Sequence, residues 1–170
     1  MSISNELAKA AQYLTVNTSS NVITSNATLS LTGSSSSLGT LLLNAAETTN
    51  VSATAANGTM TYYLSSQSVM YLTTNAAANW NPNVAFSSGT TLNTALATGQ
   101  TITFAMLVTQ GTTAYYSNTI YIDGSSVTPK WQGGSAPTAG NASGIDGYTY
   151  TIIKTGSAAY TVLASQTKYT

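Results

Sequence analysis

From residue 48 onward, short runs of alternating apolar and polar side chains are separated by turn residues. The clearest run is TITFAMLV at 101–108, which alternates at first and then becomes fully apolar, as a central strand does. Glycine-bearing pairs such as Asn57-Gly58 and Asp123-Gly124 are typical of tight turns. The pattern predicts strands at residues 48–54, 59–65, 68–74, 82–86, 100–109, 113–122, 126–131, 147–154 and 159–166. So many short strands indicate a mainly β protein with a β-sandwich or jelly-roll-like domain.

Two segments between these strands have a different pattern. Residues 88–99 predict one or two helical turns, with Ser88 or Thr90 as the N-cap and Gly99 closing the segment. Residues 132–144 contain no apolar periodicity, so they are expected to form an ordered surface loop. Loops of this length often carry function.

The beginning of the chain predicts a short helix over residues 4–14. Ser4 can cap it, and Ile3, Leu7, Ala10 and Leu14 recur at helical spacing on one narrow face. Such a helix either covers one end of the β domain or docks on another subunit, and both interpretations stay open because so short a helix needs something to pack on.

Residues 15–45 are rich in Ser, Thr and Asn with brief apolar bursts, which indicates an extended arm that touches a neighbouring chain. We therefore expect two parts: a helix and arm over 1–45, used for attachment and oligomerisation, and a β-sandwich module over 46–170. The candidate assembly contacts are Ile3, Leu7, Ala10, Leu14, Leu41, Leu42 and Leu43.

Composition narrows the function classes. The chain has no His, Cys or Arg, its charged residues make up 5%, and its formal net charge is +0. Such weak charge repulsion suits a subunit fixed in an assembly better than a free monomer. Four basic residues offer no patch for nucleic acid.

Location can also be predicted from the sequence. The longest purely apolar run, 104–108, is too short to cross a membrane. The first residues lack the pattern of a signal peptide. We therefore expect a protein that is made in a cytoplasm and remains there or leaves by assembly and lysis.

The residue types also restrict catalysis. A Ser-His-Asp triad and a thiol nucleophile are excluded because His and Cys are absent. A pair of carboxylates would have to include Asp123 and Asp146, and each precedes a glycine, which favours two turn-forming aspartates. We therefore expect no enzyme, no catalytic residue, no cofactor and no metal.

Aromatic side chains are the most suggestive candidates for binding. The chain has 11 Tyr and 2 Trp but only 2 Phe. Trp80, Tyr115, Tyr116 and Trp131 are candidate surface-binding residues that would stack on sugars or anchor an interface. The alternative is that half of the rings form core and the rest cover sheet edges, and this alternative is the stronger one for any single ring.

The C-terminal part carries a set of motifs in a fixed order. They include AMLVTQG at 105–111, VTPKWQGGSAP at 127–137, GNASGID at 140–146, YTIIKTG at 150–156 and VLASQTK at 162–168, together with NAAANW at 75–80. Residues 46–170 resemble a module of fibre-like and other structural proteins of tailed phages, notably cyanophages. The resemblance implies a virion component with no known catalytic residues. In that family the module often ends much longer chains, whereas a short helix and arm precede it here, which favours a small accessory subunit.

Together these observations predict a non-enzymatic phage virion protein. It would be a head decoration (cement) or tail-associated subunit, anchored by its N-terminal arm, assembled in the host cytoplasm and located in the virion. Its partners would be other virion proteins and further copies of itself, for which a trimer would be suitable. The rival hypothesis is a tail-fibre or adhesin domain that binds host surface glycans, and a third class is an enzyme acting through Asp123 and Asp146.

Overall fold

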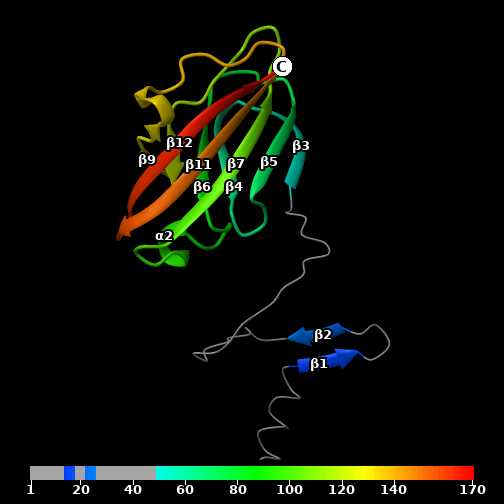
Figure 1. Ribbon diagram of the computed structural model, residues 1–170, viewed down its shortest axis with the longest axis vertical. Helices are drawn as coiled ribbons and strands as arrows, with labels where there is room; N and C mark the ends of the chain where they lie inside the picture. Colours follow the sequence, from blue (N-terminus) through cyan, green and yellow to red (C-terminus); the bar gives the residue numbers. More distant parts are fainter. Residues whose placement is uncertain (1–13, 18–21, 26–48) are drawn as a thin grey trace, which may run out of the picture. The chain divides into compact units, whose positions relative to one another are not determined.

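The computed structural model describes residues 14–17, 22–25 and 49–170 of the chain. The chain divides into two compact units, Met1–Asn44 and Ala45–Thr170. In the first unit, strands β1 (Leu14–Asn17) and β2 (Val22–Ser25) pair antiparallel, with Leu14 opposite Ser25 (Figure 1). These strands are rich in Val, Ile and Thr, the β-branched residues that favour extended backbone.

Of the predicted assembly contacts, only Leu14 lies among the described residues. It opens β1, so the prediction that it ends a helix is wrong for this residue. The rest of the predicted helix, with Ile3, Leu7 and Ala10, and the apolar burst at Leu41, Leu42 and Leu43 lie outside the described residues.

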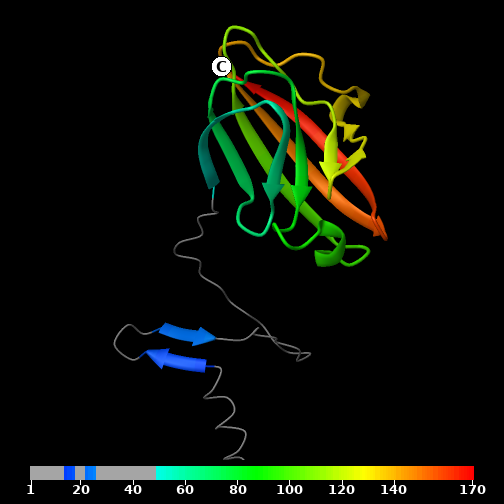
Figure 2. The same cartoon turned by 180° about the vertical axis from the view of Figure 1, so that it is seen from behind.

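The second unit is built from two sheets that face each other (Figures 1 and 2). The prediction of a mainly β, sandwich-like fold is confirmed. The six-stranded sheet has the order β10-β12-β11-β7-β5-β3, and the four-stranded sheet has the order β4-β6-β8-β9. The strands of the six-stranded sheet are β3 (Thr49–Ala55), β5 (Val69–Thr74), β7 (Thr101–Thr109), β10 (Lys130–Trp131), β11 (Ile145–Gly156) and β12 (Ala159–Tyr169). Those of the four-stranded sheet are β4 (Gly58–Tyr63), β6 (Trp80–Ala85), β8 (Ile120–Ile122) and β9 (Ser125–Val127).

Successive strands from β3 to β8 alternate between the two sheets. Each time the chain comes back to a sheet after one strand in the other sheet, the new strand runs in the same direction as the previous strand of that sheet. β3, β5 and β7 are therefore parallel to one another, and so are β4, β6 and β8. Two antiparallel hairpins follow, β8 with β9 and β11 with β12, while β10 pairs parallel with β12.

The structure corrects two of the predicted strands. In the predicted strand 113–122 only β8 is a strand, because backbone amides before it bind side chains instead of a neighbouring strand: Tyr115 binds the Gln110 amide oxygen and Tyr116 that of Asn79. The predicted strand 126–131 breaks at the buried Pro129, which has no N–H to donate to a sheet. Its two halves, β9 and β10, belong to different sheets.

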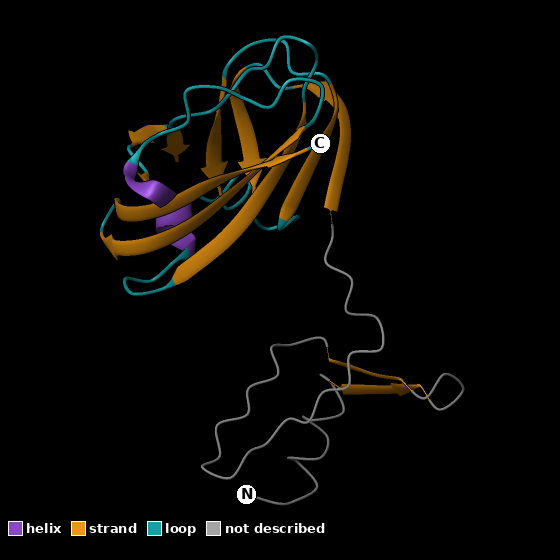
Figure 3. Ribbon diagram, turned by 45° about the horizontal axis from the view of Figure 1, so that its top comes forward, coloured by secondary structure: helices purple, strands orange, loops and turns teal. Residues whose placement is uncertain are grey.

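The predicted helical turns at 88–99 are reduced to one, α2 (Leu92–Ala95) (Figure 3). Thr91 caps it instead of Ser88 or Thr90, because the Thr91 side chain accepts a hydrogen bond from the Thr94 amide. Gly99 has a positive φ of 90° and lies beyond the helix, in the turn that leads to β7. The helix buries Leu92 under one end of the sandwich. No helix in residues 14–17, 22–25 or 49–170 is long and apolar enough to cross a membrane.

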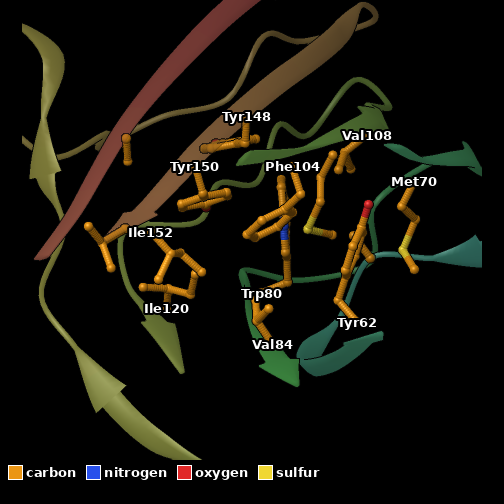
Figure 4. Close-up of a cluster of buried hydrophobic side chains, with 14 of the residues drawn as sticks. Tyr62, Met70, Trp80, Val84, Phe104, Val108, Ile120, Tyr148, Tyr150 and Ile152 are labelled. Carbon is orange, nitrogen blue, oxygen red and sulfur yellow. The ribbon is translucent and has the colours of Figure 1, made fainter. Parts of the chain in front are cut away.

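The core between the sheets is dominated by stacked and tilted rings (Figure 4). Phe104 lies between Tyr62, at a centroid distance of 4.7 Å, and Tyr150, at 5.1 Å. Burial raises the pKa of Tyr62, Tyr148 and Tyr150 well above its usual range, so these hydroxyls are neutral. Two of them bind the 110–119 segment: Tyr148 Oη accepts from the Ser117 amide, and Tyr150 Oη lies 3.3 Å from Ser117 Oγ. Part of the excess of Tyr over Phe therefore serves the core.

Candidate binding groove beside Trp131

The four predicted surface-binding residues differ in burial. Trp80 is only 1% exposed, so the prediction that it binds at the surface is wrong. It opens β6 in the inward phase of the strand, and its ring packs edge-on against Tyr148 at 5.4 Å. Tyr115 and Tyr116 are half-buried, and Tyr115 packs against the core.

Trp131 borders two hollows in the surface. It lies in β10, which pairs parallel with β12, and its half-buried ring packs edge-on against Tyr148 and Tyr150 at 6.3 and 6.1 Å. A hollow of about 520 Å³ lies on the side of the 132–144 loop, and one of about 390 Å³ lies on the side of the sheet. Trp131 and the exposed Gln132 line both hollows, which we together name the Trp131 groove.

The lining of the groove is mostly neutral and polar. It offers amide groups, hydroxyls, one indole ring and two ammonium groups. The loop-side hollow is lined by Trp131, Gln132, Ser135, Pro137, Gln166, Thr167 and Lys168. The sheet-side hollow is lined by Lys130, Trp131, Gln132, Thr149, Thr151, Leu163, Ala164 and Ser165. Such a surface can stack an apolar face and exchange hydrogen bonds with an uncharged polar ligand.

A buried carboxylate holds the loop that borders this groove. Asp146 is fully buried in β11, and its Oδ2 accepts from Gln110 Nε2 at 2.8 Å and from the Asn141 amide at 3.0 Å. Its position between Val108 of β7 and Lys168 of β12 shows that Asp146 is not a turn residue. Burial raises the pKa of Asp146, although the donors from Asn141, Gln110 and Gln166 and the charge of Lys168 act in the opposite direction.

Gln166 and Lys168 connect the carboxylate to the groove. Gln166 Nε2 lies 2.9 Å from Tyr148 Oη, 3.1 Å from the Ala139 carbonyl and 3.3 Å from Asp146 Oδ1. Lys168 Nζ donates to the Gly140 carbonyl at 3.3 Å. The side chains that fasten the loop thus also line the loop-side hollow.

The sequence predicted Asp146 as a turn residue, and nothing in it singled out Gln110 or Gln166. A signal for Asp146 was present, because it shares the inward alternation phase of Tyr148 and Tyr150 on β11. A polar residue in that phase is buried and needs partners.

At the opposite end of the sandwich, two further charged side chains, from Asp123 and Lys154, bind the backbone of α2. Asp123 Oδ1 accepts from the Leu92 amide at 2.7 Å and Oδ2 from the Asn93 amide at 2.9 Å. Lys154, which is 7% exposed, donates from Nζ to the Asn93 carbonyl and, at 2.7 Å, to the Leu96 carbonyl. A negative group therefore lies at the beginning of this helical turn and a positive group at its end, as the backbone dipoles require.

Asp123 itself behaves as predicted, since it occupies the turn between β8 and β9. Both Asp123 and Gly124 have positive φ, at 51° and 82°, as a tight hairpin turn requires. Within residues 14–17, 22–25 and 49–170, no three His, Cys, Asp or Glu residues gather as a metal site would need.

No family model, curated protein or solved structure matches this chain. A functional assignment therefore depends on the geometry of the described residues and on the motifs of residues 46–170.

Replacement of Gly140 by alanine should release the loop from Asp146. A Cβ at Gly140 would lie 2.1 Å from the Tyr115 carbonyl oxygen and 2.7 Å from Asp146 Oδ2, so the loop has to move away. We expect Gly140→Ala to lower the free energy of unfolding by about 1–3 kcal/mol, the cost of leaving buried polar groups without partners. Denaturant titration measures this loss, and hydrogen exchange at Asn141 reports the loop itself.

Gly89→Ala is the matched control, because a Cβ there meets nothing within 4 Å. It should leave both measurements unchanged. If Gly140→Ala unfolds at the wild-type denaturant concentration and Asn141 remains protected, Asp146 does not fasten the loop.

Proposed function

We propose that this protein is a non-enzymatic structural subunit of a tailed-phage virion. In this proposal it is a head decoration or tail-associated subunit that residues 1–45 attach to the particle. One observation supports the proposal that the protein is not an enzyme: four of the five Asp and Lys residues at 49–170 bind other parts of the same fold. These four are Asp123, Asp146, Lys154 and Lys168.

The placement of the carboxylates supports a role without catalysis. Two carboxylates that share a hydrolytic reaction lie about 5–10 Å apart. Asp146 lies near the beginning of β11, and Lys154 lies near its end. Asp123 is close to Lys154 rather than to Asp146, because Asp123 and Lys154 both bind α2. Eight residues separate 146 from 154, which is roughly 26 Å at the usual strand rise of about 3.3 Å per residue. Both carboxylates also already accept hydrogen bonds from the fold.

The remaining surface supports assembly. Lys130 is the one Asp, Glu or Lys side chain in 49–170 without a hydrogen bond or ion pair to the fold, and the outer sheet face is rich in threonine. Contacts made by such a surface depend on shape and on neutral hydrogen bonds, so salt should screen them little. The resemblance of residues 46–170 to a phage virion module supports the particle as the place of assembly.

A chain that lacks residues 1–45 tests the attachment. We expect the full chain to associate with purified particles of its phage and the shortened chain to remain free, because the sandwich unit would have lost its anchor. The copy number per particle is measured by quantitative mass spectrometry, and near-ultraviolet circular dichroism checks that the shortened chain is folded. Equal copy numbers for the two chains would disprove the proposed attachment.

A second function, glycan binding, is favoured by the Trp131 groove. It combines one ring with the amides of Gln132 and Gln166 and the ammonium of Lys168. Rings and amides of this kind suit a neutral polyhydroxylated ligand.

Exposure of the protein to a glycan array tests this second function. If the groove binds a glycan, Gln132→Ala should weaken binding at least tenfold, because Gln132 lines both hollows and is exposed. This substitution avoids Trp131, whose loss would also disturb the packing around Tyr148. Thr59→Ala, exposed on β4, is the control and should bind as the wild type does. The absence of any bound glycan, or equal binding by both variants, would contradict glycan binding in the Trp131 groove.

A further inference from the structure

The two lateral sides of the sandwich end differently (Figure 2). On one side, the outermost strands are β9 and β10, of three and two residues. On the other side, they are β3 and β4, of seven and six residues. Among the described residues, β3 and β4 therefore have no strand beside their outer edges. On the opposite side, β10 pairs with only two of the 11 residues of β12, Leu163 and Ala164.

The open edges lack most of the usual protection. Natural proteins blunt exposed sheet edges with charged residues, proline, bulges or short strands. The sequences of β3, TNVSATA, and β4, GTMTYY, contain neither a charged residue nor a proline. β3 has a register shift only after Ser52, so Thr49–Ser52 form a regular stretch. Among the described residues, β5 is the one strand that pairs with this stretch, so its other edge can pair with a further strand.

Val51 lies within this stretch. Its side chain is 64% exposed, the largest exposure among the large apolar side chains of residues 49–170. It lies beside Tyr71 in the register between β3 and β5, on the outer face of the six-stranded sheet. Apolar surface of this kind is stabilised when another apolar group covers it.

We propose that β3 pairs antiparallel with β3 of a second copy of this chain, across a two-fold axis, with Val51 opposite Val51. A strand related to itself by a two-fold axis runs antiparallel to its copy, and both partners present the same surface. The neutral edge permits this because no like charges are brought together, whereas a charged edge would repel its own copy. The six-stranded sheet then continues from one copy into the next.

The contact is small for a stable dimer, since specific interfaces bury about 1,600 Å² in total. The pairing therefore depends on concentration, and it is strengthened wherever copies are held near one another. This inference concerns the sandwich unit alone and does not require the proposed place in a virion.

A single cysteine at position 51 tests the pairing, because the full chain contains no other thiol. Opposite residues of antiparallel strands have Cα atoms about 4.5–5.5 Å apart, within the range of about 4.4–6.8 Å that a disulfide spans. We expect Val51→Cys to form a disulfide-linked dimer under mild oxidation at least tenfold faster than Leu163→Cys. Leu163 is the matched control, an apolar side chain that is 45% exposed on β12, away from the edge.

A second variant, Val51→Lys, tests the same pairing without a cross-link. Val51→Lys should lower the dimer fraction of the full chain in sedimentation equilibrium, because two lysines would then face each other. Its exposed position means that the fold should tolerate the change.

Three outcomes would overturn the proposal. The first is cross-linking of Val51→Cys no faster than that of Leu163→Cys. The second is a monomeric Val51→Cys variant whose thiol is shielded from a thiol reagent, which would show that residues 1–48 of the same chain cover the edge. The third is a disulfide between position 51 and a different protein of the particle, with no homodimer.

Discussion

The inward face of β11 is the constraint on which the rest of the sandwich unit depends. It begins with a buried carboxylate, Asp146, continues with the apolar side chains of Tyr148, Tyr150 and Ile152, and ends with a buried ammonium, Lys154. The rings and Ile152 fill the space between the sheets, so the two charged groups are carried to opposite ends of the core. A buried charge is tolerated only when hydrogen-bonding partners surround it. The partners are the 132–144 loop at one end and α2 at the other, so a single strand fixes both segments.

This arrangement explains how a chain with so few charges uses them. Asp146 binds the loop beside Trp131, and Lys154 binds the end of the helix whose beginning Asp123 caps. These groups bind the fold, so apart from the ammonium of Lys130 the chemistry left for a partner of the sandwich unit consists mainly of threonine and serine hydroxyls, amides, rings and backbone edges. The proposed virion role and the outer edge of β3 use that neutral chemistry, and the groove adds the ammonium groups of Lys130 and Lys168.

The sequence was most informative where alternation decides the structure. The predicted strand 100–109 is close to the observed β7, because its inward side chains Phe104, Met106 and Val108 are all buried. The parallel pairing of β3, β5 and β7 could not be predicted, since alternation shows which side chains face inward but not which strand lies alongside. The predicted strand 113–122 failed for a related reason, because side chains from distant positions bind its amides.

At the candidate site, too, the sequence predicted some positions wrongly because distant parts of the chain decide them. Trp80 was predicted to bind at the surface as one of the abundant aromatic residues, whereas strand β6 begins at this residue and turns its ring inward. Asp146 was assigned to a turn because Gly147 follows it. The structure gives Gly147 another purpose, since a Cβ there would lie 2.9 Å from the ring of Tyr169 and 3.5 Å from Leu107. Glycine in this strand makes room for a ring that packs across the sheet.

Equilibrium unfolding of two lysine variants tests most directly whether the charges of the sandwich unit serve the fold. Lys154→Met would leave the carbonyls of Asn93 and Leu96 without their donor, at a cost of about 1–3 kcal/mol. Lys130→Met removes an exposed ammonium and should change the free energy of unfolding by no more than about 0.5 kcal/mol. A stability loss confined to Lys154→Met is the predicted result. Equal stability of Lys154→Met and the wild type, or an equal loss in both variants, would contradict this account.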